Sequence, residues 1–293
     1  MSAKRATFNF FTYVIHMTPA PRFLLESDAA KFGLAPNNPA AVLEKKNEIL
    51  QRCLLDAKEL SPHRKNTAAI KKKNFAVKDG TFLLRVGSEK RINLSDEQLD
   101  DHETQHFPYV YVYFDNRKDN QVLAIQQNQD VFSDTNVTAK IIQENINSMI
   151  APFNLECVIK PQFDENDFWK YVEKHQKSII RLQFSILAPN LPRIRASIPE
   201  DLNKLQSSIG SQLGTFDFQS LTNSHLTISK TNEDIAGLAK AAADGGGEIK
   251  VKIKGLKKFQ SMDKTKKEMS IKEFEANGKP EDVQRTIEKL LES

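Results

Sequence analysis

The sequence has few cysteines and no cysteine pair. Cys53 and Cys157 are the two in 293 residues, and they stand far apart along the chain. Two isolated cysteines provide neither a disulfide framework nor the CxxC pairs of a zinc knuckle. We therefore expect a protein of a reducing compartment, the cytoplasm.

Long apolar runs are also missing. No stretch approaches the roughly 18 to 20 consecutive apolar residues of a membrane span. The segment "FNFFTYVIHM" after Lys4 and Arg5 resembles a signal peptide, but Asn9, Thr12 and His16 interrupt its apolar run. We interpret it as a first strand and expect a soluble protein without a membrane span.

A large excess of charge of one sign is missing from the chain as a whole. The formal charge is +4, and 39% apolar residues indicate a globular protein. The charge is nevertheless uneven, because residues 249–272 contain nine lysines and two acidic residues. That segment carries +7 and the rest of the chain −3, so a site for an anionic partner would depend on local clustering.

The hydrophobic pattern alternates between strand and helix periods, which predicts an α+β protein of mixed, largely antiparallel sheet layers packed with helices. We expect an N-terminal α/β portion with a hairpin over 1–104. The portion over 105–293 would hold a mixed sheet, a basic C-terminal hairpin and a terminal helix. Expected strands are 6–17, 74–86 around the Asp79-Gly80 turn, 109–114, 121–126, 154–161, 178–190, 224–230 and 248–254. Expected helices are 39–60 capped by Asn38, 133–153, 164–177, 200–213, 232–244 and 280–293, and 89–106 is a polar connection.

The strongest functional signal is the stretch "GEIKVKIKG". A period of two turns Ile249, Val251 and Ile253 inward and the three intervening lysines outward, about 6.5 to 7 Å apart. This spacing is similar to that of phosphates along a DNA strand, but lysines also protect solvated edge strands from aggregation, and both interpretations stay open. The candidate nucleic-acid contacts are Lys250, Lys252, Lys254, Lys257, Lys258, Lys264, Lys266 and Lys267. A second basic set comprises His63, Arg64, Lys65, Lys71, Lys72 and Lys73.

Three weaker patterns suggest other functions. Glu248-x-Lys250 supplies a carboxylate and an ammonium, as in a metal-dependent nuclease, although no partner Asp is evident. His102 and His106 would share a metal if they lay on a helix, but a solvated turn is the simpler interpretation. The row of alternate tyrosines in "YVYVYF" would either stack bases or lie beneath a second helix layer or dimer surface. No catalytic residue, cofactor or metal site is predicted.

The order of elements over residues 107–260 resembles that of a known group. The phrases "FPYVYVYF", "QVLAIQQ", "LECVIKP", "IIRLQFSILAPN" and "GGGEIKVKIKG" occur in this order. In outline they are similar to a diverse bacterial and prophage group linked to phage defence, which includes the RexA type of phage-exclusion protein and the DNA-binding subunit of the Kiwa system. The resemblance implies a cytoplasmic, non-enzymatic DNA-binding or sensing protein, often a homodimer, that works with an effector protein.

The sequence therefore predicts sequence-independent nucleic-acid binding, with DNA preferred to RNA, in antiphage defence or phage exclusion. Phosphate contacts by lysines carry no base information, which suits a general sensor. The alternatives are a metal-dependent nuclease centred on Glu248 and Lys250, and a protein-interaction scaffold of a defence complex.

Overall fold

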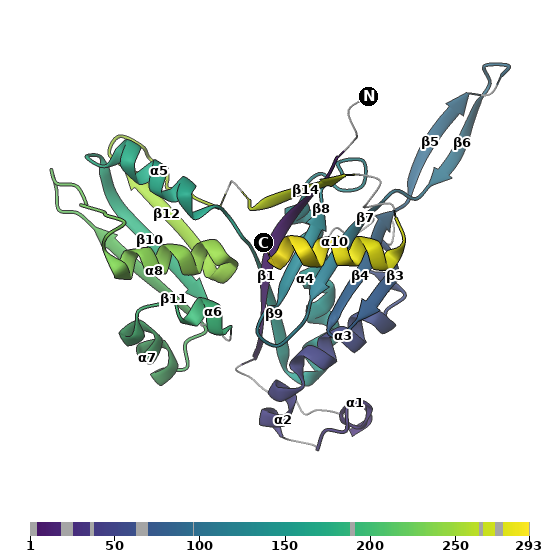
Figure 1. Ribbon diagram of the computed structural model, residues 1–293, viewed down its shortest axis with the longest axis horizontal. Coiled ribbons are helices and arrows are strands. Elements are labelled where there is room, and N and C mark those ends of the chain that lie inside the picture. The colour runs from purple at the N-terminus through teal and green to yellow at the C-terminus, as the bar shows by residue number, and fades with distance from the viewer. Residues whose placement is uncertain are drawn as a thin grey trace.

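The computed structural model describes residues 5–18, 26–35, 38–62, 70–95, 97–187, 191–263, 266–272 and 278–292. The chain is an α+β protein with antiparallel sheets, as the sequence predicts. Figure 1 shows a large sheet with its helices, a smaller sheet with helices beside it, and a hairpin that projects from the large sheet.

The large sheet has eight strands in the order β14-β1-β8-β7-β4-β3-β2, and β9 also pairs with β1. Every pairing is antiparallel. Strands β3 and β4 form the expected hairpin, in which Asp79 and Gly80 both have positive φ, at 40° and 78°. The strands are β1 (Arg5–Met17), β2 (Glu59–Leu60), β3 (Ile70–Lys78), β4 (Thr81–Ser88), β7 (Tyr109–Asp115), β8 (Val122–Gln126), β9 (Leu155–Pro161) and β14 (Glu268–Lys272).

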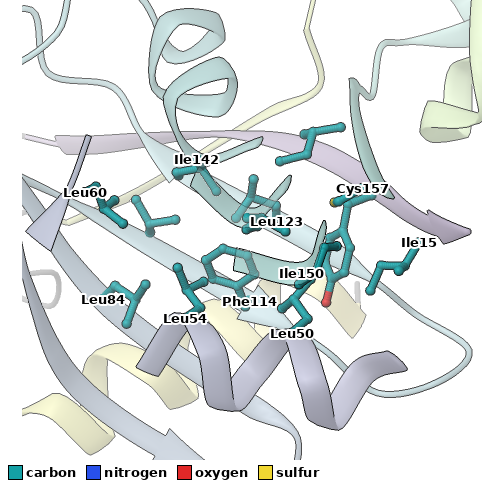
Figure 2. Close-up of a cluster of buried hydrophobic side chains, with 14 of the residues drawn as sticks. Ile15, Leu50, Leu54, Leu60, Leu84, Phe114, Leu123, Ile142, Ile150 and Cys157 are labelled. Atoms are coloured by element: carbon teal, nitrogen blue, oxygen red, sulfur yellow. The ribbon is translucent and has the colours of Figure 1, made fainter. Parts of the chain in front are cut away.

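Helices α3 (Lys46–Asp56) and α4 (Thr135–Ile150) cover one face of this sheet. Figure 2 shows Leu50 and Leu54 of α3 beside Phe114 and Leu123 of the sheet, with Ile142 of α4 on the same cluster. Two short helices, α1 (Glu26–Lys31) and η1 (Ala151–Phe153), complete this layer.

The helix expected over 39–60 begins as predicted but is divided. Asn38 begins α2 (Pro39–Glu44), because its side chain accepts a hydrogen bond from Ala41 N at 3.1 Å. The helical run is interrupted at Lys45, and α3 ends at Asp56. The cap was therefore predicted correctly, and the length was overestimated.

The C-terminal helix α10 (Pro280–Glu292) covers the opposite face of the large sheet. Val283 and Ile287 pack there with Tyr111 and Tyr113, whose side chains are fully buried. The tyrosine row is therefore covered by a second helix layer, which was one of its two interpretations, and those two rings cannot stack bases. Within the described residues, no helix is both long enough and apolar enough to cross a membrane.

The smaller sheet has the strand order β11-β10-β12-β13. Its inward side chains pack with two helices that lie against the sheet in Figure 1, α5 (Glu165–His175) and α8 (Glu233–Ala241). An asparagine cap also begins α8, since the Asn232 side chain accepts from Ile235 N at 3.0 Å. The remaining elements of this part are β10 (Ile179–Leu187), α6 (Pro192–Arg195), α7 (Glu200–Ser208), β11 (Leu213–Gln219), η2 (Ala242–Gly246), β12 (Gly247–Ile253) and β13 (Gln260–Ser261).

The prediction of a strand over residues 224–230 is wrong. That segment forms no strand, and β11 instead pairs with β10 from Leu213 to Gln219. Residues 224–230 contribute the buried Ile228 to the core, and Leu226 N donates to Ile179 O of β10 at 2.8 Å. Gly214 and Asp217 lower the strand propensity of β11, so the local sequence did not mark this segment as a strand. Tertiary pairing decided that it lies beside β10.

The polar segment over 89–106 forms a two-stranded hairpin of β5 (Lys90–Ser95) and β6 (Asp101–His106). All residues of both strands are exposed, and the hairpin projects from the large sheet in Figure 1. The segment "RINLS" of β5 alternates polar and apolar residues, but "DHETQH" of β6 does not, so the sequence held a signal for only one of the two strands.

The expected division at residues 104 and 105 falls within a set of hydrogen-bonded strands. Strand β4 pairs with β7, and β1 pairs with both β8 and β9. Strands from both sides of that position therefore share the large sheet.

Thr12 of β1 connects the two sheets. Its hydroxyl donates to Asp244 O at 2.6 Å and accepts from Gln162 Nε2 at 2.9 Å. Gly245 of η2 lies directly against Thr12, and Phe163 N donates to Ala243 O at 3.0 Å. The turn that leads into β12 is therefore packed on the first strand of the large sheet.

We expect Gly245→Ala to destabilise the protein more than Gly210→Ala. Both glycines have positive φ, at 83° and 65°, so each substitution carries a backbone cost of roughly 1–2 kcal/mol. A Cβ at Gly245 would also lie 2.6 Å from the Thr12 side chain, whereas one at Gly210 meets nothing within 4 Å. Overpacking of this kind costs roughly 1–3 kcal/mol more. Urea denaturation of both variants measures the difference, and equal decreases in stability would show that the Thr12 contact is not tight.

Candidate nucleic-acid interface

Strand β12 places its lysines on one face of the smaller sheet. Ile249 and Val251 are fully buried against the helices, whereas Lys250 and Lys252 are partly exposed and Lys254 is exposed. The alternation predicted from the sequence is confirmed for Ile249 to Lys252, and these two lysines point away from the helix-covered side. Lys254 lies in the turn directly after β12.

The neighbouring strand β10 extends this polar face. Arg181 lies directly across from Lys252, and Gln183 lies across from Lys250. The alternate residues of β10, such as Leu182, belong to the buried core. The face therefore continues over two paired strands, with side chains that donate hydrogen bonds.

An aromatic ring lies among these cations. The Arg181 guanidinium is 5.5 Å from the centroid of the Phe259 ring, and Lys252 Nζ is 5.9 Å from it. Both distances lie within the range of cation–π interactions. Arg181 also binds Asp217 through two hydrogen bonds, of 2.8 and 2.5 Å, which hold the guanidinium in place. The pKa of Asp217 is lowered by this pairing, so its carboxyl group stays charged at neutral pH.

The position of β12 in the sheet changes along its length. β12 pairs with β10 on one side and with β13 at Lys250 and Val251 on the other. Among the described residues, no strand pairs with this second side at Lys252 or Lys254. The end of the row therefore lies at an open edge, where lysines also protect against strand pairing, and both interpretations of the row stay open.

The other predicted lysines divide into two places. Lys257 and Lys258 are exposed after Gly255, in the segment between β12 and β13. Lys267 is exposed beside the large sheet, where its backbone N donates to Gln162 O at 2.8 Å. Lys264 lies outside the described residues.

Lys266 is not part of the lysine face. Its ammonium group pairs with Asp134 and donates to Thr135 Oγ1 at 2.9 Å, and 13% of its side chain is exposed. It lines a separate cavity of about 630 Å³ together with Lys160 and Glu248. Its contacts join the segment before β14 to the start of α4.

Glu248 begins the lysine row and neutralises part of it. Its two carboxylate oxygens pair with Lys160 Nζ at 2.8 Å and with Lys250 Nζ at 3.0 Å. The hydrogen bond from Lys160 is the largest cause that lowers the pKa of Glu248, against the opposing effect of burial. Both oxygens that a nuclease would use to hold a cation are therefore bound to ammonium groups.

The described residues offer no alternative ligand set for a metal. No three His, Cys, Asp or Glu side chains among them are grouped as metal ligands. His102 and His106 lie on the strand β6, not on a helix, so their four-residue spacing corresponds to about 13 Å along the strand. That spacing keeps the two rings from sharing one ion.

The second basic set has structural contacts where it is described. Lys72 Nζ donates to Leu54 O and Leu55 O near the end of α3, at 2.6 and 3.0 Å, and burial lowers its pKa to about 8. Lys71 pairs with Glu59, and Lys73 lies on β3 beside them. His63, Arg64 and Lys65 lie outside the described residues.

Sequence reasoning did not select Arg181, Phe259 or Lys160. Arg181 was detectable, because "IIRLQFSIL" alternates apolar and polar residues and turns Arg181 to the polar face. Phe259 and Lys160 had no local signal, since their roles arise from contacts with β10 and β12.

No family model, curated protein or solved structure matches the chain. The resemblance to phage-defence proteins over residues 107–260 therefore stays a prediction. The function of the interface is inferred from its geometry and charge.

We expect Glu248→Gln to strengthen nucleic-acid binding. The substitution removes a carboxylate from the row and frees Lys250 for a phosphate, so the slope of log affinity against log salt should steepen by about 0.9 for a duplex. Fluorescence anisotropy over a salt series measures the slope. Glu173→Gln, an equal charge change at an exposed position of α5, is the control. Unchanged binding combined with loss of a metal-dependent cleavage activity would instead support the nuclease alternative.

Proposed function

We propose that this protein binds nucleic acid without sequence specificity through the polar face of the smaller sheet. The observation that carries the proposal is the row Lys250, Lys252 and Lys254 beside Arg181, on the side of the sheet that α5 and α8 leave open. Lys257 and Lys258 continue the positive charge in the segment between β12 and β13. Such a row neutralises successive phosphates and releases their counterions.

The composition of the face supports general over base-specific recognition. Its donors are ammonium, guanidinium and amide groups on strands, which suit contacts to phosphate oxygens. The Phe259 ring adds a surface on which an unpaired base can stack.

DNA as the preferred nucleic acid, the role in antiphage defence or phage exclusion, the homodimer and the effector partner form the rest of the proposal. These rest on the resemblance over residues 107–260. The cytoplasm is the proposed compartment, in keeping with two free cysteines, of which Cys157 is buried. We propose no catalytic step for this chain.

The proposal predicts that changing Lys250, Lys252 and Lys254 to Gln weakens binding and flattens its salt dependence. For duplex DNA the slope of log affinity against log salt should fall by about 0.9 for each phosphate that the variant no longer neutralises. Labelled duplex DNA, single-stranded DNA and RNA would be titrated with both proteins between about 50 and 200 mM salt, a range over which phosphate binding weakens measurably.

The matched control changes Lys170, Lys174 and Lys240 to Gln. These lysines are exposed on α5 and α8, which cover the other side of the sheet. Both triple variants replace three lysines with glutamine, so they lower the net charge of the protein equally. Equal effects of the two triple variants would show that binding depends on the net charge of the protein and not on the position of the lysines. A wild-type protein that binds no nucleic acid at low salt would refute the function and leave the scaffold alternative.

A further inference from the structure

A cavity of about 290 Å³ lies where the lysine row ends. Its walls come from the start of β10, the end of β11 with the loop that follows, and the end of β12. The volume is near the lower limit of the roughly 300–1,000 Å³ that is typical of small-molecule sites. The lining residues are Ile180, Arg181, Gln219, Ser220, Leu221, Thr222, Asn223, Ser224, Lys252 and Lys254.

The lining of this cavity is cationic. It contains Arg181, Lys252 and Lys254 but no carboxylate. Asp217 binds Arg181, but among the described residues neither Lys252 nor Lys254 has a carboxylate partner within 4.0 Å. The Ser220 hydroxyl donates to Ile180 O and Ser224 O, whereas the hydroxyl groups of Thr222 and Ser224 also line the cavity and can donate to an anion. This set fits a phosphate group, and the two uncompensated charges favour a dianionic monoester over a singly charged diester.

The backbone holds the loop after β11 beside this cavity. Ser220 N donates to Ile180 O at 3.0 Å, and Leu226 N donates to Ile179 O at 2.8 Å, so both ends of the loop are bound to the start of β10. Asn223, which lines the cavity, adopts a positive φ of 65° within this loop. The loop therefore forms the wall of the cavity at the start of β10, next to the end of the lysine row.

The ring of Phe259 lies beside the same two cations that line the cavity. Arg181 and Lys252 each contact this ring and the cavity. A nucleotide with its phosphate in the cavity would have an aromatic surface close to its base. The site thus combines cationic groups for the phosphate of a terminal nucleotide with an aromatic ring for its base.

We propose that this cavity binds the terminal phosphate of a nucleic-acid strand, so that the protein distinguishes phosphorylated strand ends from strand interiors. The inference rests on the proposed function, since it assigns an end to the strand that the lysine row would hold. It assigns Lys254, Lys252 and Arg181 to the phosphate and Phe259 to the terminal base.

The test compares oligonucleotides of one sequence that carry a 5′-phosphate, a 3′-phosphate or hydroxyl groups at both ends. Single-stranded and blunt duplex forms are titrated with the full chain at fixed salt by fluorescence anisotropy. A charge-assisted hydrogen bond contributes enough that one phosphorylated end should bind roughly tenfold more tightly than the hydroxyl form.

Two single variants with the same charge change locate the effect. Lys254→Gln, in the cavity, should abolish the preference for the phosphorylated end. Lys258→Gln, outside the cavity in the segment between β12 and β13, should lower the affinity for all forms and keep the preference. Equal wild-type binding of all three end forms, or equal effects of the two variants, overturns the inference and leaves the proposed function intact. Absence of binding to every form would refute the proposed function itself.

Discussion

Burial of β1 on both faces is the constraint on which the rest of the structure depends. This strand contributes Phe11 to the core beneath α3 and α4, Phe10 to the core beneath α10, and Val14 to the core of the smaller sheet. It also pairs with β8 on one side and with β14 and β9 in succession on the other. A change in its register by one residue would exchange the residues of two cores, so its position is strongly determined.

The position of the basic face follows from this strand. Thr12 joins β1 to the turn Ala242–Gly246, and β12 begins at the next residue, Gly247. Lys160 of β9, which pairs with Thr12, reaches Glu248 at the start of the lysine row. Lys250 and Lys252 therefore stand on a strand whose beginning is held by the large sheet, and the geometry of that strand fixes their spacing.

The charges of this face are only partly compensated, and in an ordered way. Glu248 neutralises the start of the row through Lys160 and Lys250, whereas Lys252 and Lys254 at its end have no carboxylate partner among the described residues. An anion would thus be drawn toward the end where the loop after β11 lines the cavity. This difference in charge compensation along the row gives a physical reason why the end of a nucleic-acid strand, and not only its backbone, would be recognised.

The sequence by itself determined the local elements. Asn38 caps a helix, Asp79-Gly80 makes a hairpin, and the lysines of β12 alternate with buried residues, because each depends on backbone preferences and periods within a few residues. Tertiary structure alone decided that β11 and not residues 224–230 pairs with β10. It also brought Lys160 to Glu248, Phe259 to Arg181, and Lys266 to Asp134. These contacts join residues distant in the chain, and no local pattern records which partner lies across a sheet or a cavity.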